Sequence, residues 1–217
     1  MASPVQPAPS PAPTSVPVAR PGRVGRALRN PRGVVTALWH LAKGWWYKIT
    51  LPMRGVRFSA GRNLRVMGRL SVNGPGRVIF GDDVVIGMRV TPWTHSPDAE
   101  IRVGNRVFLN GTRFGCARSI TLGDRVIVGE SHVMDTDFHS IQANRWDADA
   151  PVRVLPVVLE RNVWVGASAG ILAGTHIGAD SVVGFGAVCS GTYPPGVIIA
   201  GNPAKVIRPI PAAPTPD

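Results

Sequence analysis

The chain has 217 residues, of which 44% are hydrophobic, and it contains 25 Gly and 21 Pro. That apolar content suffices for one domain with a core, whereas so many Gly and Pro residues exclude an ordinary helical bundle. The formal net charge is +11, and 13 of the 24 Lys and Arg residues lie in the first 80 positions, whereas no acidic residue precedes Asp82. A basic N-terminal part beside a near-neutral remainder favours an anionic partner such as a phosphate-rich ligand, nucleic acid or acidic lipid.

The two ends of the chain have the composition of tails. Residues 1–22 contain seven prolines and cannot bury a core, so we expect a disordered N-terminal tail there and a short C-terminal tail at 211–217. No stretch of the chain is apolar enough for a secretory signal or for a membrane span. Cys116 and Cys189 have neither metal-ligand spacing nor disulfide density, so we predict reduced thiols and a cytoplasmic protein.

A basic segment at 23–52 follows the N-terminal tail. Its apolar residues recur at helical spacing and predict a helix over residues 33–49. The apolar stripe carries three Trp and is flanked by Lys43 and Lys48, which is the composition of an amphipathic helix lying on anionic lipid. The same stripe suits a second role equally well, which is to cap the end of the domain that follows.

A repeat of six residues then replaces the helical pattern. It is most regular in the last block, where the inward apolar positions are Val165, Ile171, Ile177, Val183 and Cys189, and an earlier series runs Leu122, Val128, Met134. Glycine often follows the apolar position, as at Gly81 and Gly104, and a small or β-branched residue often stands four positions after it. We interpret each unit as a short strand and a tight corner, with three units to a coil, so that stacked coils bury one apolar column.

With its C-terminal segment Ala200–Arg208, this repeat resembles the hexapeptide-repeat acyltransferases, in particular the galactoside, maltose and xenobiotic acetyltransferase branch. The resemblance covers about residues 60–210. It implies an all-β solenoid, a left-handed parallel β-helix, as one domain at 53–210 with an inserted loop at 138–156. It also implies a homotrimer whose acyl-CoA sites lie between neighbouring β-helices.

The resemblance implies catalytic residues on two coils. His139, in the segment Asp-Phe-His-Ser at the start of the loop, corresponds to the family's general base, and a mostly neutral imidazole suits that role. Asn110, one coil earlier, corresponds to an asparagine that contacts the acceptor hydroxyl or the oxyanion; the alternative is an asparagine tolerated at a corner. Asp135 and Asp137 are candidates for binding the acceptor or orienting the imidazole, and they are equally suited to being solvated loop carboxylates.

The donor acetyl-CoA is expected against the C-terminal coils. Trp164 corresponds to a tryptophan beside the pantetheine arm and Ala167 to a backbone amide that is hydrogen-bonded, although Trp164 packing against the loop is the alternative. Phe185 and Ser190 stand where relatives often have a small residue and a Thr-Lys-Asp segment, which leaves donor affinity and the identity of the acyl group open. Lys205 and Arg208 correspond to cations near the CoA phosphates.

The resulting expectation is an acyl-CoA-dependent O-acyltransferase that moves an acetyl group to a hydroxyl of a sugar or glycan precursor. A non-catalytic β-helix recruited to a membrane assembly by its basic segment is the alternative. A zinc enzyme of the γ-class carbonic anhydrase type is disfavoured, because His95, His132 and His139 are 37 and 7 residues apart and the second gap does not fit that family's closely spaced pair. We therefore expect no metal, and no nucleic-acid module is recognisable in the sequence.

Overall fold

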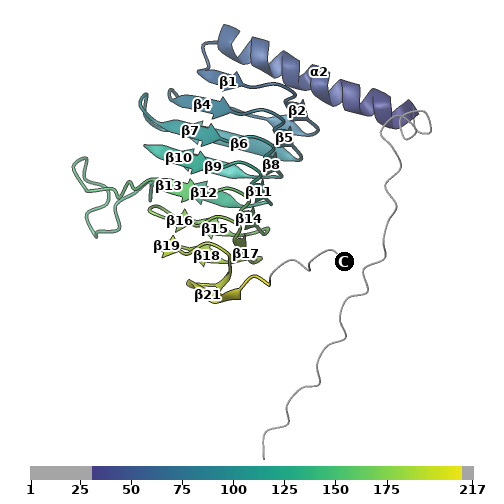
Figure 1. The fold of residues 1–217 in the computed structure, drawn as a ribbon. Coiled ribbons are helices and arrows are strands. Elements are labelled where there is room, and N and C mark those ends of the chain that lie inside the picture. The colour runs from purple at the N-terminus through teal and green to yellow at the C-terminus, as the bar shows by residue number, and fades with distance from the viewer. Residues whose placement is uncertain (1–30, 212–217) are drawn as a thin grey trace, which may run out of the picture. The chain divides into compact units, whose positions relative to one another are not determined.

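The computed structural model describes residues 31–211, so the predicted N-terminal tail and all but one residue of the C-terminal one lie outside its described part (Figure 1). The chain divides into two compact units, Met1–Thr36 and Ala37–Asp217. In the described residues, the second unit contains every strand.

Three parallel sheets make up this second unit. The first sheet consists of β1 (Phe58–Ala60), β4 (Arg77–Phe80), β7 (Glu100–Val103), β10 (Ser119–Leu122), β13 (Val157–Leu159), β16 (His176–Ile177) and β19 (Thr192–Tyr193). The second consists of β2 (Arg65–Val66), β5 (Val85–Ile86), β8 (Phe108–Leu109), β11 (Ile127–Val128), β14 (Trp164–Val165), β17 (Val182–Val183), β20 (Val197–Gly201) and β21 (Ala204–Pro209). The third consists of β3 (Arg69–Leu70), β6 (Arg89–Thr94), β9 (Arg113–Cys116), β12 (His132–Met134), β15 (Gly170–Ile171) and β18 (Val188–Cys189).

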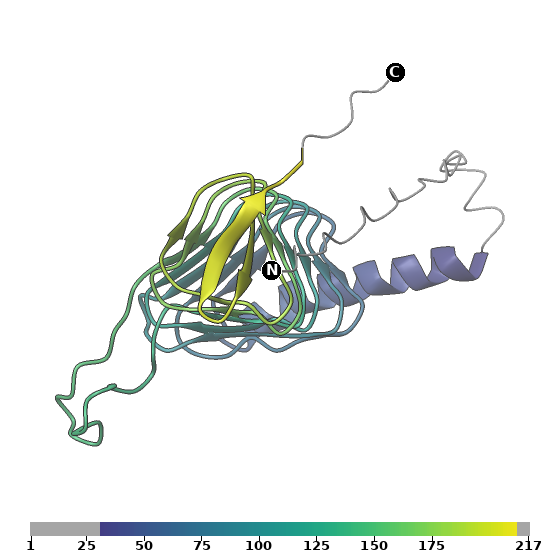
Figure 2. The same cartoon turned by 90° about the horizontal axis from the view of Figure 1, so that it is seen from below.

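Successive strands visit the three sheets in turn, and each strand pairs with the strand one coil away. Seen along its axis, this unit has a triangular section, with the segment between β12 and β13 projecting from one corner (Figure 2). The pairing is parallel throughout except for β21, which runs antiparallel to β20. The predicted β-solenoid of hexapeptide repeats is therefore confirmed.

The core is the apolar column that the repeat predicts. Its last block is fully buried, from Val165 through Ile171, Ile177 and Val183 to Cys189, each with 0% of its surface exposed. One predicted position of the column, Met134, is wrong. Val133 fills the column in place of Met134, because Val133 aligns with Phe114 on one side and Ile171 on the other, so this coil is one residue shorter.

The glycines at the corners have a different reason from the predicted one. Gly81 and Gly104 lie outside the left-handed region of φ, whereas Asp83, Arg106 and Arg125 adopt it at the same corner, with φ of 60°, 56° and 61°. A Cβ on Gly81 would lie 2.6 Å from Asn105 Oδ1 and 2.7 Å from Gly104 O. Glycine is required there because the next coil stacks directly on it, not because of its φ.

In the described part of the chain, helix α2 (Pro31–Met53) precedes the strands and is longer than the predicted 33–49. Pro52 lies inside its last turn, and Gly55 ends the helix with φ of +78°. The Gly55 N–H donates to Pro52 O at 2.9 Å and the Val56 N–H to Leu51 O at 3.1 Å, which is a Schellman motif. Within residues 31–211, no helix combines the length and the hydropathy needed to cross a bilayer.

Candidate active site

The projecting loop between β12 and β13 is closed at its base by pairing between its two arms. Thr136 and Val154 form an antiparallel bridge, and the Leu155 N–H donates to Asp135 O at 2.9 Å. Arg153 adds a bidentate ion pair with Asp137, at 3.0 and 3.1 Å. The base of the loop is thus held in place, whereas its outer part, residues 141–149, is exposed.

Phe138 links this loop to the body of the solenoid. It adopts φ of +61°, and its ring lies on Gly115 of β9, where a Cβ would overlap Phe138 Cζ. The ring also meets His95 edge to face at a centroid distance of 4.8 Å, and His95 is stacked on Trp93 at 5.2 Å. The sequence analysis did not predict these ring contacts. A glycine at the outward strand position 115 was a signal that another group packs closely against it.

His139 follows this anchored residue directly and is exposed. Its backbone N–H donates to Asp137 O at 2.7 Å, which makes a tight turn at the start of the loop. The imidazole lines a groove of about 350 Å³ with Asp137, Ser140, Ile141, Arg145 and Trp146. This groove brings together a proton acceptor, a guanidinium and a large exposed indole, which are groups that suit a hydroxyl-bearing ligand.

Asp135 lies elsewhere, inside the solenoid. Its side chain has 0% of its surface exposed, and it accepts backbone N–H groups from Ala117 at 2.7 Å, Arg118 at 2.7 Å and Ser119 at 2.6 Å. This carboxylate thus binds the backbone of the preceding coil at the corner between β9 and β10 and stabilises it. The geometry therefore disagrees with all three predicted possibilities for Asp135: binding the acceptor, orienting the imidazole, or being a solvated loop carboxylate.

Asn110 stands at the corner between the second and third sheets. Its Oδ1 accepts the Met88 N–H at 3.0 Å, so its side chain bridges two coils. The carbonyl oxygen thereby uses one of its two lone pairs, and the Nδ2 amide group is the part of the side chain that can donate to a ligand. Such a group donates hydrogen bonds and suits an oxygen that carries negative charge.

Most of the residues predicted to bind the acyl donor acetyl-CoA lie on the second sheet or at the corner that Asn110 occupies. Trp164 is 53% exposed on the outer face of β14, in register between Ile127 and Val182. Ala167 and Phe185 lie at this corner two and three coils beyond Asn110, and Phe185 is 78% exposed. Together these side chains form an outward apolar strip.

Two further predicted donor residues, Lys205 and Arg208, are exposed on β21, which pairs with β20 of the second sheet. Ser190 lies apart from them, at the corner between the third and first sheets. There it contacts Tyr193, whose hydroxyl lies within hydrogen-bonding distance of two carbonyl oxygens, Ser190 O at 3.3 Å and Ala204 O at 3.2 Å. Burial raises the pKa of Tyr193. An apolar strip that ends in two cations matches the chemistry of CoA, with its pantetheine arm and its phosphates.

The topology separates the two halves of the predicted site within one chain. Asn110 and the apolar strip lie at or beside the corner that precedes the third sheet, whereas the loop with His139 leaves the corner that follows it. The predicted catalytic residues therefore lie on different corners of a single solenoid.

The other histidines do not gather with His139 into a metal site. His132 lies on the outer face of β12 and is exposed, and His95 is engaged with aromatic rings. No group of three or more His, Cys, Asp or Glu residues with the geometry to hold a metal ion occurs within residues 31–211.

Comparison with known proteins agrees with this fold. Residues 156–191 match the family model of the bacterial transferase hexapeptide (six repeats). The galactoside O-acetyltransferase of Escherichia coli is 30% identical over 92 residues, which are 42% of this chain and 45% of that protein. A tetrahydropyridine-dicarboxylate N-acetyltransferase of Staphylococcus aureus is 41% identical over 58 residues, 27% of this chain and 24% of that protein. The aligned stretches thus span less than half of these two relatives.

Solved structures show the same fold at low sequence identity. A variant of AntD, an N-acyltransferase from Bacillus cereus in complex with dTDP-4-amino-4,6-dideoxyglucose and coenzyme A, superposes with a TM-score of 0.62 at 18% identity, covering 75% of this chain and 90% of that one. A hexapeptide-repeat-containing acetyltransferase from Vibrio cholerae gives 0.54 at 22% identity, covering 88% and 95%. By its repeat, its solenoid and these matches, the chain has the fold of the hexapeptide-repeat acyltransferases and is similar to them over part of its length.

Proposed function

We propose that the protein is an acyl-CoA-dependent O-acyltransferase that transfers an acetyl group from acetyl-CoA to a hydroxyl of a sugar or glycan precursor in the cytoplasm, without a metal. The observation that carries the proposal is the exposed His139 in a groove on an anchored loop, inserted into a solenoid of the hexapeptide-repeat family. The similar proteins named above as acetyltransferases or acyltransferases support the reaction class. The relatives named for O-acetyl transfer and those named for N-acyl transfer differ in the acceptor atom, so the choice of a hydroxyl rests on the groups of the His139 groove.

The donor fits the second sheet. Trp164 would offer apolar area for the pantetheine arm, the Ala167 N–H would donate to it, and Lys205 and Arg208 would neutralise the phosphates. Acetyl-CoA would supply the activated acyl group there.

His139 would take the proton of the acceptor hydroxyl as its oxygen bonds to the thioester carbonyl carbon. The Nδ2 group of Asn110 would donate to the carbonyl oxygen while that oxygen carries negative charge, since Oδ1 of Asn110 is already bonded to Met88. When the carbon–sulfur bond breaks, the imidazolium would return the proton to the leaving thiolate. The products are an ester and a free thiol, with no net change at the enzyme.

Because His139 and Asn110 lie on different corners, one solenoid does not bring them together. We propose that a homotrimer does so, with the loop of one copy reaching the Asn110 corner and the apolar strip of its neighbour. The side chain of Asp137 lines the His139 groove and would contact the acceptor from the same copy.

A thiol-release assay with acetyl-CoA and a panel of sugars tests the proposal, with ester formation checked by mass spectrometry. His139→Ala is expected to lower kcat by about 10²- to 10⁴-fold and to leave CoA affinity unchanged. His132→Ala, an exposed histidine outside the loop, is the matched control and should leave kcat unchanged.

The scaffold alternative makes the opposite prediction for the same assay. No turnover with any acceptor, and no slow hydrolysis of acetyl-CoA, would support a non-catalytic β-helix. Equal activity of the His139→Ala and His132→Ala variants would retain an enzyme but remove His139 from the reaction.

A further inference from the structure

Helix α2 has two faces of different character in the second unit, which begins at Ala37. One face packs against the first coil of the solenoid: Gly44 and Leu51 are buried, and a Cβ on Gly44 would overlap Leu64 O. The opposite face is apolar and exposed. It consists of Leu38, Trp39, Ala42, Trp45, Trp46, Ile49 and Met53.

The two lysines of the helix belong to the packing side. Lys43 Nζ donates to Met67 O at 3.1 Å and Gly68 O at 2.7 Å, and Lys48 Nζ donates to Gly61 O at 2.9 Å. Both ammonium groups are thus engaged with carbonyl groups of the first coil. These contacts fix the roll of the helix about its axis, so that the apolar face is directed away from the solenoid.

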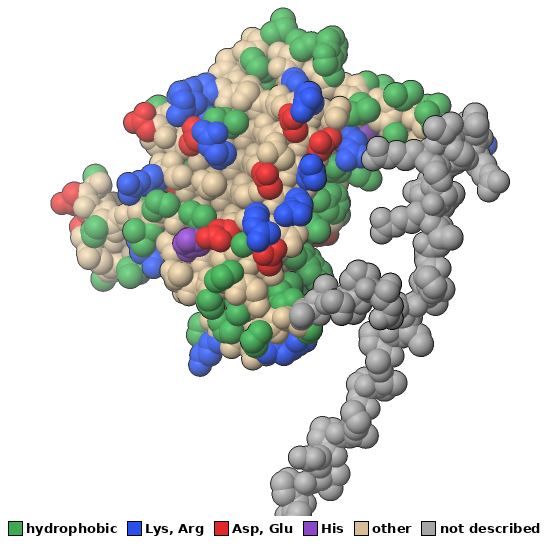
Figure 3. Space-filling view, viewed as in Figure 1, with side chains coloured by type: hydrophobic (Ala, Val, Ile, Leu, Met, Phe, Trp, Pro, Cys, Tyr) green, Lys and Arg blue, Asp and Glu red, His purple; other side chains and the backbone are tan. Residues whose placement is uncertain are grey.

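That apolar face is large and rich in tryptophan. Trp39 and Trp45 are each 65% exposed, Trp46 is 64% exposed and Met53 is 80% exposed. Figure 3 shows hydrophobic side chains gathered over this end of the second unit. Tryptophan is the side chain most typical of the bilayer headgroup region, because its ring is apolar and its N–H is a donor.

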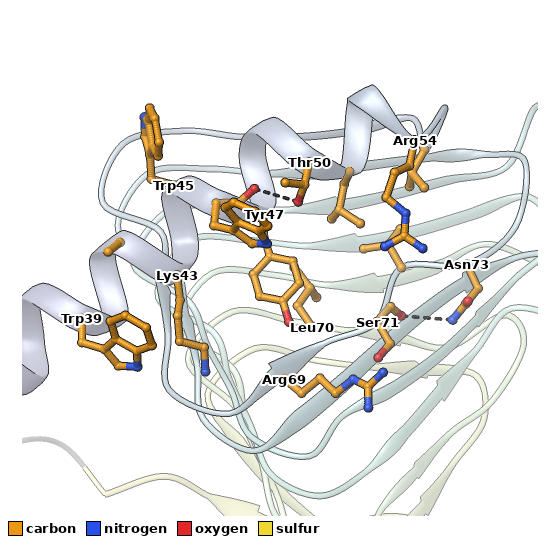
Figure 4. Close-up of a pocket in the computed structure, with 15 residues that line it drawn as sticks. Trp39, Lys43, Trp45, Tyr47, Thr50, Arg54, Arg69, Leu70, Ser71 and Asn73 are labelled. Atoms are coloured by element: carbon orange, nitrogen blue, oxygen red, sulfur yellow. Dashed lines mark hydrogen bonds between the residues drawn. The ribbon is translucent and has the colours of Figure 1, made fainter.

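A groove of about 840 Å³ runs along the flank of this face, between α2 and the segment from Arg69 to Asn73 (Figure 4). Trp39 and Trp46 line it from the helix, and Arg54 and Arg69 add two guanidinium groups. Neither Arg54 nor Arg69 forms an ion pair within the described residues. An aromatic groove with two uncompensated cations suits a phosphate ester that carries an apolar chain.

We propose that α2 is an interfacial helix that docks the protein on an anionic lipid bilayer, with Trp39, Trp45 and Trp46 in the headgroup region and a lipid phosphate between Arg54 and Arg69. Charge selects this occupant over a second copy of the chain. No acidic residue precedes Asp82, so two copies meeting at this face would bring arginine against arginine. The proposal does not depend on the acyl transfer proposed above.

Vesicle flotation of the full chain tests the docking. The probe is a set of vesicles of equal parts phosphatidylcholine and phosphatidylglycerol, with pure phosphatidylcholine for comparison. The protein should float with the anionic vesicles, and added salt should weaken the binding. A variant with Trp39, Trp45 and Trp46 all changed to Ala should lose at least about tenfold in partitioning, because three half-exposed rings no longer enter the interface.

Two controls distinguish the loss of side chains on this face of α2 from the loss of any exposed tryptophan or arginine. Trp146→Ala removes an indole that is 91% exposed on the projecting loop and should float like the wild type. Arg54→Gln with Arg69→Gln should weaken binding to anionic vesicles, whereas Arg125→Gln, an exposed arginine at a distant corner, should not. The double arginine variant and its Arg125→Gln control still test the proposal if the triple tryptophan variant does not fold.

Three results would overturn the proposal. The first is a wild-type protein that stays in solution with anionic vesicles, and the second is equal flotation of the α2 variants and their controls. The third is a smaller molecular mass in solution for the folded triple tryptophan variant, because the face would then be covered by another copy.

Discussion

Replacing Asp135 by Asn tests whether a buried carboxylate holds the base of the projecting loop. The carboxylate accepts N–H groups from Ala117, Arg118 and Ser119, the latter two on the same oxygen, Oδ2. An asparagine has only one accepting oxygen. If that oxygen takes the place of Oδ2, the amide group is turned toward the Ala117 N–H, and a donor then faces a donor.

The expected cost follows from these bonds. Hydrogen bonds to a charged group contribute about 1.5–3 kcal/mol each, and the variant loses one and weakens two by removing the charge. We therefore expect Asp135→Asn to lower the free energy of unfolding by about 2–4 kcal/mol. For a domain of this size that corresponds to a decrease in Tm of roughly 5–15 °C.

Thermal unfolding followed by circular dichroism measures this shift, and Asp137→Asn is the matched control. Asp137 forms an ion pair with the half-exposed Arg153, so its loss should cost less than about 1 kcal/mol. An Asp135→Asn variant that melts with the wild type would refute the bracing role. A raised KM for the acceptor with unchanged stability would instead support the role in acceptor binding that the sequence suggested.

Three further predictions concern the donor strip, the loop anchor and the thiols. Trp164→Ala should weaken CoA binding by about 1–3 kcal/mol in a calorimetric titration, and unchanged affinity would leave its indole with a packing role only. Gly115→Ala places a methyl group against the ring that anchors the loop and should lower kcat by roughly 10²-fold while CoA affinity is kept; full turnover would show that this ring does not position His139. Burial raises the pKa of the Cys189 thiol to about 11, and burial with the nearby carboxylate raises that of Cys116, so both lose thiolate at a given pH. Both should therefore resist iodoacetamide at mildly alkaline pH in the native state and react as two free thiols after unfolding, whereas rapid native alkylation would contradict their burial.

The fold was predictable because a six-residue repeat is local information. The sequence of each unit indicates which side chain points into the core, and the buried column from Val165 to Cys189 follows directly from it. The error at Met134 arises where the repeat is broken, since the coil before the loop is one residue shorter and only the register with Phe114 reveals it.

The surroundings of the site were less predictable because they depend on contacts between coils. Nothing near Phe138 in sequence indicates that its ring lies on Gly115, and nothing near Asp135 indicates that it caps three N–H groups of the preceding coil. The lysines of α2 show the same limit. Their charge suggested lipid contact, whereas the structure uses Lys43 and Lys48 to bind carbonyl groups of the first coil.

The way the solenoid ends has a consequence for its solubility. A stack of parallel strands leaves unpaired backbone N–H and C=O groups at its outer edges, and such edges recruit strands from other molecules. At one end, α2 covers the first coil, and its lysines take up the carbonyl groups of Gly61 and Gly68. At the other, β21 pairs antiparallel with β20, which reverses the strand direction that a further coil would need. The repeat is thereby prevented from growing end to end into a fibre, as terminal caps do in other repeat proteins.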